Sequence, residues 1–307
     1  MKESTKGHIA IIIANIIFGL SAPFSKVLFN DFLTYSQLLV FRSLGGAILF
    51  WGASLLIPRE SLKIKEIGIL VIAAFVGVIF NQGLYLAGLA RTTPIQTGLL
   101  QTLGPVYTLF LAFLILKEPL SFKKILGVLI GMVGALILIF SEYRSQILIK
   151  NQSYLGDILI ILSGISFALY LTLFIDLIKK YSPITLMKWL FLIATLFLIP
   201  FYFNDLKDFS WAEIIQKDKM GIFLSYLGYV VVFGTFIGYI LVAYTQKRIR
   251  PTVVSMYVYI QPIIMSIVSI YWGLGTLKIH QIIAAVFIFC GVYIVTISKK
   301  KGTYLIK

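Results

Sequence analysis

Residues 94–105 read PIQTGLLQTLGP, and residues 251–262 read PTVVSMYVYIQP. Each segment begins and ends with proline, and one offset of 157 residues places both prolines of the first segment on those of the second. The same offset places Gly134 on Gly291. The chain therefore contains an internal repeat, which rests on matching prolines and matching hydropathy rather than on high identity between the halves.

Around these two segments the chain is apolar along its whole length. Of its 307 residues, 59% are hydrophobic and 13% are charged, and the mean hydropathy is +0.96. A soluble domain carries about 25% charged residues, so this chain has too little polar surface to cover a globule in water. Segments such as 67–78 and 125–140 are apolar on every side. They predict membrane helices, because strands of a membrane barrel alternate apolar and polar residues.

The hydropathy pattern predicts ten transmembrane helices. Their ranges are 8–29, 35–57, 67–90, 95–116, 123–140, 155–178, 184–203, 221–247, 252–273 and 278–298. Outside these spans or at their ends, 17 Lys and Arg residues fall on the side of the N-terminus and 7 fall on the opposite side. By the positive-inside rule, this bias predicts a multi-pass protein of the inner (cytoplasmic) membrane with both termini in the cytoplasm.

Five helices in each half is an odd number, so the second half enters the membrane from the side opposite to the first. The predicted domains are a five-helix repeat over 1–141, an extracytoplasmic linker over 142–154 and a second five-helix repeat over 155–307. The predicted fold class is thus an all-α integral membrane protein with two inverted repeats. This architecture is typical of secondary transporters, whose solute site lies near the midplane between the halves.

Several motifs also resemble a known family. The sequence FGLSAPFSK at 18–26 is similar to the first-helix motif of the EamA family in the drug/metabolite transporter superfamily. Arg42 on the second helix and LKEPL at 116–120 fit the same family. The resemblance implies alternating access and transport of metabolites such as amino acids, nucleobases or sugars, often outward. One departure is Gly275, which occupies the place matching Glu118 where the family usually carries a glutamate.

Uncharged polar residues inside the predicted spans are the candidates for a solute-binding site, because polar groups in hydrocarbon are costly and tend to mark pathways. These candidates are Asn15, Asn81, Gln82, Tyr85, Thr97, Gln101, Tyr170, Thr235, Tyr239, Tyr257 and Gln261. Amides and tyrosines donate and accept hydrogen bonds without carrying charge, and the rings add stacking surface. They favour a zwitterionic, aromatic or heterocyclic solute. Each residue could instead bond one helix to another, and the sequence leaves both interpretations open.

Two basic residues and two prolines also lie inside the spans. Lys26 is expected to reach the membrane interface or to pair with Asp31. For Arg42, structural pairing and solute contact are equally open. Pro105 and Pro262 each remove a backbone hydrogen bond, which predicts kinks at matching sites. Such kinks would shape a cavity, act as hinges or serve packing alone.

The sequence carries no recognisable catalytic, cofactor or metal-binding motif. It holds one cysteine and two histidines, and no Asp or Glu falls in the middle third of a predicted span. We therefore predict a transporter rather than an enzyme, without cofactor or metal, whose partners are a small-molecule solute and the lipid bilayer.

The net charge of +15 comes mostly from Lys and Arg residues in the loops between the spans, so it does not indicate a nucleic-acid partner. Glycines on the fifth helix are compatible with a homodimer. A channel-like facilitator and an integral-membrane enzyme are the alternatives.

Overall fold

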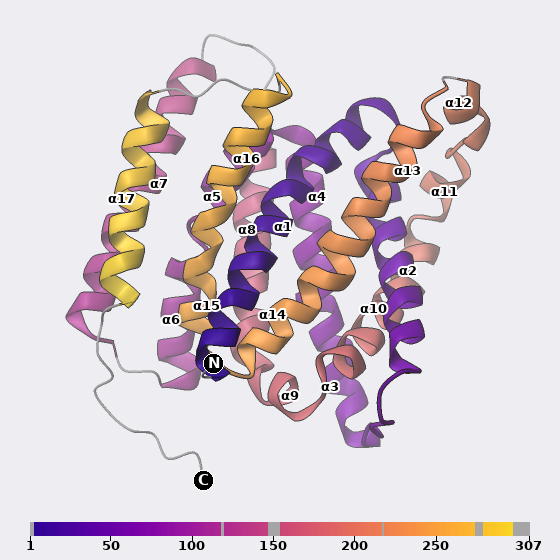
Figure 1. Ribbon diagram of the computed structural model, residues 1–307, viewed down its shortest axis with the longest axis horizontal. Helices are drawn as coiled ribbons and strands as arrows, with labels where there is room; N and C mark the ends of the chain where they lie inside the picture. Colours follow the sequence, from indigo (N-terminus) through magenta and orange to yellow (C-terminus); the bar gives the residue numbers. More distant parts are fainter. Residues whose placement is uncertain (1–2, 118–119, 147–153, 217, 274–278, 297–307) are drawn as a thin grey trace.

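The computed structural model is a bundle of helices (Figure 1). It describes residues 3–117, 120–146, 154–216, 218–273 and 279–296. Within these ranges no strand occurs, and seven helices are long and apolar enough to cross a membrane. This confirms the predicted all-α membrane fold. The count of ten spanning helices stays a prediction, and Glu118, Gly275 and most of the predicted linker lie outside the described residues.

The first half contains eight helical elements. They are α1 (Glu3–Asp31), α2 (Tyr35–Ser54), α3 (Ile64–Ala74), η1 (Phe75–Phe80), α4 (Asn81–Arg91), α5 (Pro94–Gln101), α6 (Gly104–Leu116) and α7 (Phe122–Gln146). The second half contains α8 (Tyr154–Leu173), α9 (Ile175–Lys180), α10 (Pro183–Phe201), α11 (Phe203–Lys207), α12 (Trp211–Gln216), α13 (Met220–Gly228), η2 (Tyr229–Ile237), α14 (Gly238–Gln246), α15 (Pro251–Met256), η3 (Tyr257–Tyr259), α16 (Ile260–Tyr271) and α17 (Ile279–Thr296). The elements η1 and η2 are π-helical, and η3 is a 3-10 turn.

Local sequence signals set several helix ends. Thr34 caps α2 and forms a capping box with Gln37. Thr93 and Ser182 accept hydrogen bonds from backbone N–H groups at the starts of α5 and α10, and each precedes a proline in the first helical turn. Helix α6 ends at Lys117, whose backbone is left-handed with φ 51°. These caps satisfy backbone groups that a helix end would otherwise leave unpaired.

The two halves pack on each other with reciprocal contacts. Helix α1 packs against α14 and α16 of the second half, and α8 packs against α4 and α6 of the first half. Helix α2 packs against α10, and α7 packs against α17. In a two-fold arrangement every contact between unlike elements occurs twice with the roles exchanged. The helix contacts therefore have the pattern expected of two related repeats, whereas the predicted residue boundaries of the repeats stay a prediction.

The first helices of the two halves run in opposite directions. In Figure 1, α1 begins at the lower edge, where the N-terminus lies, whereas α8 leads into α9 at that same edge. The contacts agree, because Arg248 at the end of α14 binds Glu3 at the start of α1, and α9 contacts α14. The end of α8 thus lies on the same face as the start of α1, which is the arrangement of inverted repeats.

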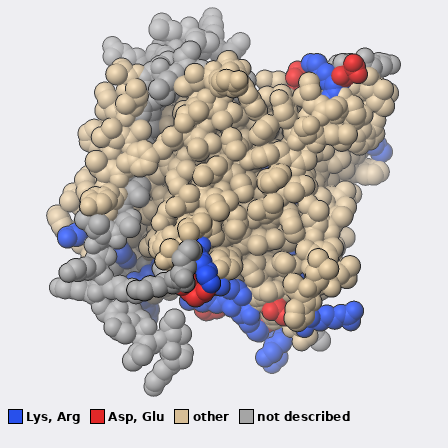
Figure 2. All heavy atoms as spheres, viewed as in Figure 1, with Lys and Arg blue, Asp and Glu red and all other residues tan. Residues whose placement is uncertain are grey.

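The outer surface of the bundle is apolar. Large hydrophobic side chains such as Ile48, Leu196 and Ile267 are at least 60% exposed. Figure 2 shows one face whose centre carries no charged residue, with Lys and Arg mostly gathered along the lower edge and a small mixed cluster at the upper right. A soluble monomer rarely exposes so large an apolar surface. This surface is the one that lipid would cover.

Close approach of helices depends on glycine at two places. A Cβ atom at Gly291 of α17 would lie 2.4 Å from the carbonyl oxygen of Gly127 on α7. A Cβ atom at Gly77 of η1 would lie 2.4 Å from the Tyr170 ring on α8. The glycine face of α7 therefore packs against α17 within the same chain. The homodimer stays a prediction.

Candidate functional site

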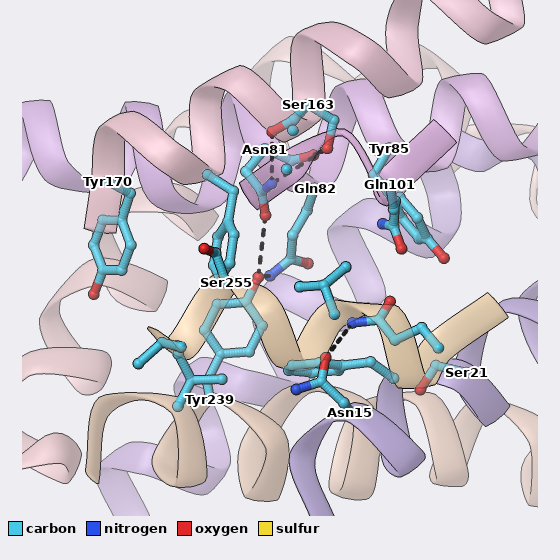
Figure 3. Close-up of a pocket in the computed structure, with 18 of the residues that line it drawn as sticks. Asn15, Ser21, Asn81, Gln82, Tyr85, Gln101, Ser163, Tyr170, Tyr239 and Ser255 are labelled. Carbon is cyan, nitrogen blue, oxygen red and sulfur yellow. Dashed lines mark hydrogen bonds between the residues drawn. The ribbon is translucent and has the colours of Figure 1, made fainter. Parts of the chain in front are cut away.

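A cavity of about 120 Å³ lies between the two halves. The first half lines it from α1, α2, α4, α5 and α6, and the second half lines it from α8, α10, α14, α15, η3 and α16. Uncharged polar side chains alternate there with aromatic and aliphatic ones (Figure 3). The cavity is the place in the structure where the polar residues of both halves meet.

Most of the predicted site residues line this cavity. They are Asn15, Asn81, Gln82, Tyr85, Gln101, Tyr170, Tyr239 and Gln261. These residues were predicted as site residues because a polar group that faces lipid is energetically costly. In the structure they face the cavity.

Three predicted residues lie outside the cavity lining. Thr97 is fully buried within α5. The hydroxyl of Tyr257 lies 2.7 Å from Nδ1 of His8, near the start of α1. Thr235 contacts the guanidinium of Arg42 and so reaches the site through that residue.

One hydrogen-bonded group joins the two halves at the cavity (Figure 3). Asn81 donates through Nδ2 to the backbone oxygen of Ser163 at 3.1 Å, and the Ser163 hydroxyl donates to the backbone oxygen of Asn81 at 2.8 Å. Gln82 donates through Nε2 to the Tyr239 hydroxyl at 2.9 Å, and that hydroxyl lies 3.5 Å from Oδ1 of Asn81. These bonds fix the orientation of the amides across α4, α8 and α14.

A second pair links α1 with α16. Gln261 donates through Nε2 to Oδ1 of Asn15 at 2.7 Å, and Asn15 donates through Nδ2 to the backbone oxygen of Ile11 at 2.8 Å. The sequence left open whether these polar residues bind a solute or bond one helix to another, and the structure is compatible with both roles for the same side chains. They bond helices together, and they also face the cavity.

Some polar atoms at the cavity lack a partner. In the described part of the chain, no hydrogen bond is found for Oε1 of Gln82, Oε1 of Gln101 or the hydroxyl of Tyr170, and all three atoms are buried. Buried polar atoms normally have a partner in the protein or in bound water. These atoms are thus available to a polar group that enters the cavity.

A π-helical segment precedes the polar residues in each half. Element η1 ends at Phe80, directly before Asn81, and η2 ends at Ile237, two residues before Tyr239. The offset between Phe80 and Ile237 is the 157 residues that align the prolines. Single wide turns of this type inside α-helices are frequent at functional sites. Here they set the direction of the cavity-facing side chains on both helices.

The helices that carry the two prolines are interrupted at matching places. Helix α5 ends before Thr102 and α6 restarts at Gly104, whereas η3 separates α15 from α16. Each proline lacks the N–H group that would bond to the carbonyl four residues earlier. Those carbonyls belong to Gln101 and Val258, and both of these residues line the cavity. The predicted kinks are therefore breaks that bring backbone to the cavity wall.

Arg42 is the charged residue of the cavity lining that the sequence left undecided. Its side chain lines the cavity, the residue is only 5% exposed, and its Nε donates to the Thr235 hydroxyl at 3.1 Å. Ser21, Ser163 and Ser255 also line the cavity and were not selected. Serine commonly bonds to the backbone of its own helix in membranes, so nothing in the sequence distinguishes these three as cavity residues.

One of the two expectations for Lys26, the pairing with Asp31, is not observed in the described part of the chain, whereas the reach of Lys26 to the membrane interface stays a prediction. Its Nζ donates to three backbone oxygens at the end of α4, those of Leu89, Ala90 and Thr92, at 2.7 to 3.1 Å. Asp31 instead lies 3.9 Å from Nζ of Lys219. A cation is favourable at the C-terminal end of a helix, where carbonyls lack partners. Lys26 thus ties α1 to the end of α4.

Charged residues also join the halves at the face that carries the N-terminus. Arg248 donates to Oε2 of Glu3 at 2.8 Å, and hydrogen bonds from Lys6 and Arg248 hold the pKa of Glu3 below its usual value. Lys180 binds Glu66, and this bond raises the pKa of Lys180. At this face the first contact joins α1 to the end of α14, and the second joins α3 to α9.

Comparison with known proteins gives consistent results. The model of the EamA-like transporter family matches residues 5–140 and 154–297. The uncharacterized transporter YyaM of Bacillus subtilis is 27% identical over 77% of this chain and 75% of its own. An uncharacterized transporter of Archaeoglobus fulgidus is 23% identical over 95% of this chain and 98% of its own. A WAT1-related protein of Arabidopsis thaliana is 21% identical over 97% of this chain and 80% of its own.

A solved structure shares the fold. A crystal structure of a protein with 14% sequence identity superimposes with a TM-score of 0.68 and covers 96% of both chains. At this identity the likeness concerns the arrangement of helices alone.

Proposed function

The chain belongs to the EamA-like transporter family, and we propose that it is a secondary transporter of a small metabolite, an amino acid or a similar amphiphilic solute. It moves this solute across the cytoplasmic membrane by alternating access, and export is the direction that the resemblance favours. The family and its relatives support a membrane transporter. The solute and the mechanism are the proposal.

The observation that carries the proposal is the cavity between the two halves. Both halves contribute hydrogen-bonding side chains to it, and three buried polar atoms there lack partners in the described residues. A solute held between two inverted halves can be reached from either face when the halves rock against each other. The reciprocal helix contacts support this mechanism, because the same packing with its direction reversed gives two states of similar energy.

The orientation in the membrane follows from the charges. The proposed cytoplasmic face is the one that carries Glu3, Arg248 and the lysines of α9. Figure 2 shows Lys and Arg gathered along the lower edge of the molecule, the edge at which α1 begins in Figure 1. Basic residues are more frequent on the cytoplasmic side of membrane proteins. The short helices α11 and α12 then lie on the opposite, outer side.

Counterflow in proteoliposomes tests the proposal. The purified protein is reconstituted, and uptake of labelled amino acids, nucleobases and sugars is measured with and without the same unlabelled solute inside. An alternating-access carrier takes up label faster when the inner compartment is loaded. Asn81→Ala and Gln101→Ala should lower this uptake at least about tenfold, equivalent to about 1.4 kcal/mol of binding. The lipid-facing control Ile48→Ala should leave it unchanged.

Other results would favour the alternatives. Flux that does not respond to internal solute indicates a channel-like facilitator. A rise in thermal stability with lipids alone, unaffected by Asn81→Ala and Gln101→Ala, indicates an enzyme or scaffold that acts on lipids. Absence of both flux and binding for every solute class contradicts the proposed function.

A further inference from the structure

We propose that Arg42 binds a carboxylate group of the solute, so that the transporter selects solutes that carry a carboxylate. This inference rests on the proposed function and narrows its substrate class. Arg42 lines the cavity from α2, about 10 Å along the helix axis from Tyr35, the first residue of α2.

The guanidinium of Arg42 has few hydrogen-bond partners in the part of the chain that the structure describes. It carries five N–H donors, and within the described ranges it makes one hydrogen bond, from Nε to Thr235. No carboxylate of those ranges lies within ion-pair distance of it. A buried charge without a counter-charge destabilises the folded protein. The counter-charge that is missing from the described protein would come from a bound solute.

The acidic residues that form ion pairs in the described ranges do so elsewhere. Glu3 binds Arg248 and Lys6, Glu66 binds Lys180, and Asp31 lies near Lys219. Arg42 also does not reach a membrane interface, because it is only 5% exposed and its side chain borders the cavity. Structural pairing, which the sequence left open for this residue, is therefore not observed among the described residues.

The geometry suits a carboxylate. Thr235 accepts from Nε and thereby fixes the plane of the guanidinium, while the two terminal nitrogens have no partner in the described part of the chain. Arginine presents two parallel N–H groups that match the two oxygens of a carboxylate. Tyr85 and Tyr239 border the same cavity as Arg42.

The remainder of the lining indicates the rest of the solute. No Asp or Glu is among the described residues that border the cavity, so the positive charge of Arg42 would repel a solute that carries a net positive charge. Phe18, Phe167 and Tyr170 offer an apolar surface for a hydrocarbon or aromatic side chain. The unpaired Oε1 atoms of Gln82 and Gln101 can accept from an ammonium group. An amino acid or a small hydrophobic carboxylic acid fits these features, whereas sugars, nucleobases and cations do not.

Matched acids and amides test the inference. Counterflow is measured in proteoliposomes for L-phenylalanine, L-leucine and 3-phenylpropionate, for the amide of each, and for adenine, glucose and phenyl phosphate. We expect the wild-type protein to carry at least one acid at least about tenfold faster than its amide, a difference of about 1.4 kcal/mol. Arg42→Gln should remove the difference and Arg42→Lys should keep part of it. The control Lys188→Gln removes a cation that lies over Trp51, outside the cavity, and should change nothing.

Each other outcome has a defined meaning. If a neutral solute, an amide or phenyl phosphate is carried as fast as the acids or faster, the inference is wrong while the proposed function stands. If no solute of any class is carried, the proposed function itself fails. The comparison of acid with amide in the wild-type protein remains decisive even if Arg42→Gln does not fold.

Discussion

Gln82 and Tyr239 form a buried hydrogen bond between the halves, and its contribution to the stability of the protein can be measured. Tyr239→Phe leaves Nε2 of Gln82 without this acceptor, which costs about 1–3 kcal/mol. We expect a lower melting temperature for the solute-free protein in detergent. Tyr170→Phe is the matched control, because the Tyr170 hydroxyl is buried and has no partner in the described residues. Its removal should leave the melting temperature unchanged or raise it, and an equal loss in both variants would contradict this assignment.

Thr235 is predicted to act through Arg42. Thr235→Val and Thr195→Val both remove a buried hydroxyl that donates to a carbonyl of its own helix, and only Thr235 also accepts from Arg42. We expect a similar loss of melting temperature in both variants. Affinity for a carboxylate solute should fall about tenfold or more in Thr235→Val alone, because the lost bond to a charged group is worth about 1.5–3 kcal/mol. Titration of the solute by fluorescence or calorimetry separates the two effects, and equal affinities would refute the assigned role.

The sequence identified the uncharged cavity residues better than the charged ones. Asn81, Gln101 and their equivalents were predictable because amides inside apolar spans are costly wherever they face lipid. Arg42 could not be assigned, since its partner Thr235 is 193 residues away and only the fold brings them together. The same limit applies to the pairing of Lys26 with Asp31, which the structure does not show among the described residues. The partners of Lys26 are backbone oxygens at the end of another helix, and the sequence does not show which helix ends meet.

At the scale of the helix, Gly77 allows η1 to approach α8 closely, because it carries no side chain. Gly77→Ala would place a methyl group 2.4 Å from the Tyr170 ring, so we expect a loss of about 1–3 kcal/mol in stability. Gly68→Ala in α3 is the control, because nothing lies within 4 Å of its added methyl group. Alanine is also the better helix former, so Gly68→Ala should be neutral or slightly stabilising. Thermal denaturation of both variants decides the matter, and comparable melting temperatures would be inconsistent with close packing.

Hydropathy predicted where the long helices run but not how they are built. The interruption before Pro105 had a signal, because proline removes a hydrogen bond wherever it falls inside a helix. The π-helical segments η1 and η2 had none, since FVGVIF and YVVVFGTFI are apolar and would suit an α-helix equally well. Their wide turns depend on packing against neighbouring helices. A mean hydropathy taken over a window of sequence contains no information about that packing.

At the scale of the molecule, the proposed orientation predicts which loops can be labelled from outside the cell. The chain has one cysteine, Cys290, so a Cys290→Ala background allows single cysteines to be placed at will. A membrane-impermeant maleimide should label Asp208→Cys, between α11 and α12, in intact cells. It should label Lys179→Cys of α9 only after the cells are opened. The reverse pattern would place the termini outside and overturn the orientation.

The bond between Gln82 and Tyr239 has a consequence for how the two halves can diverge. The residues lie 157 positions apart, which is the offset between the repeats, so each contacts its own counterpart. In a dimer of identical subunits, a side chain on the two-fold axis must face a copy of itself, glutamine against glutamine or tyrosine against tyrosine. Because both halves belong to one polypeptide, an amide can face a phenol here, and either partner can be replaced without changing the other.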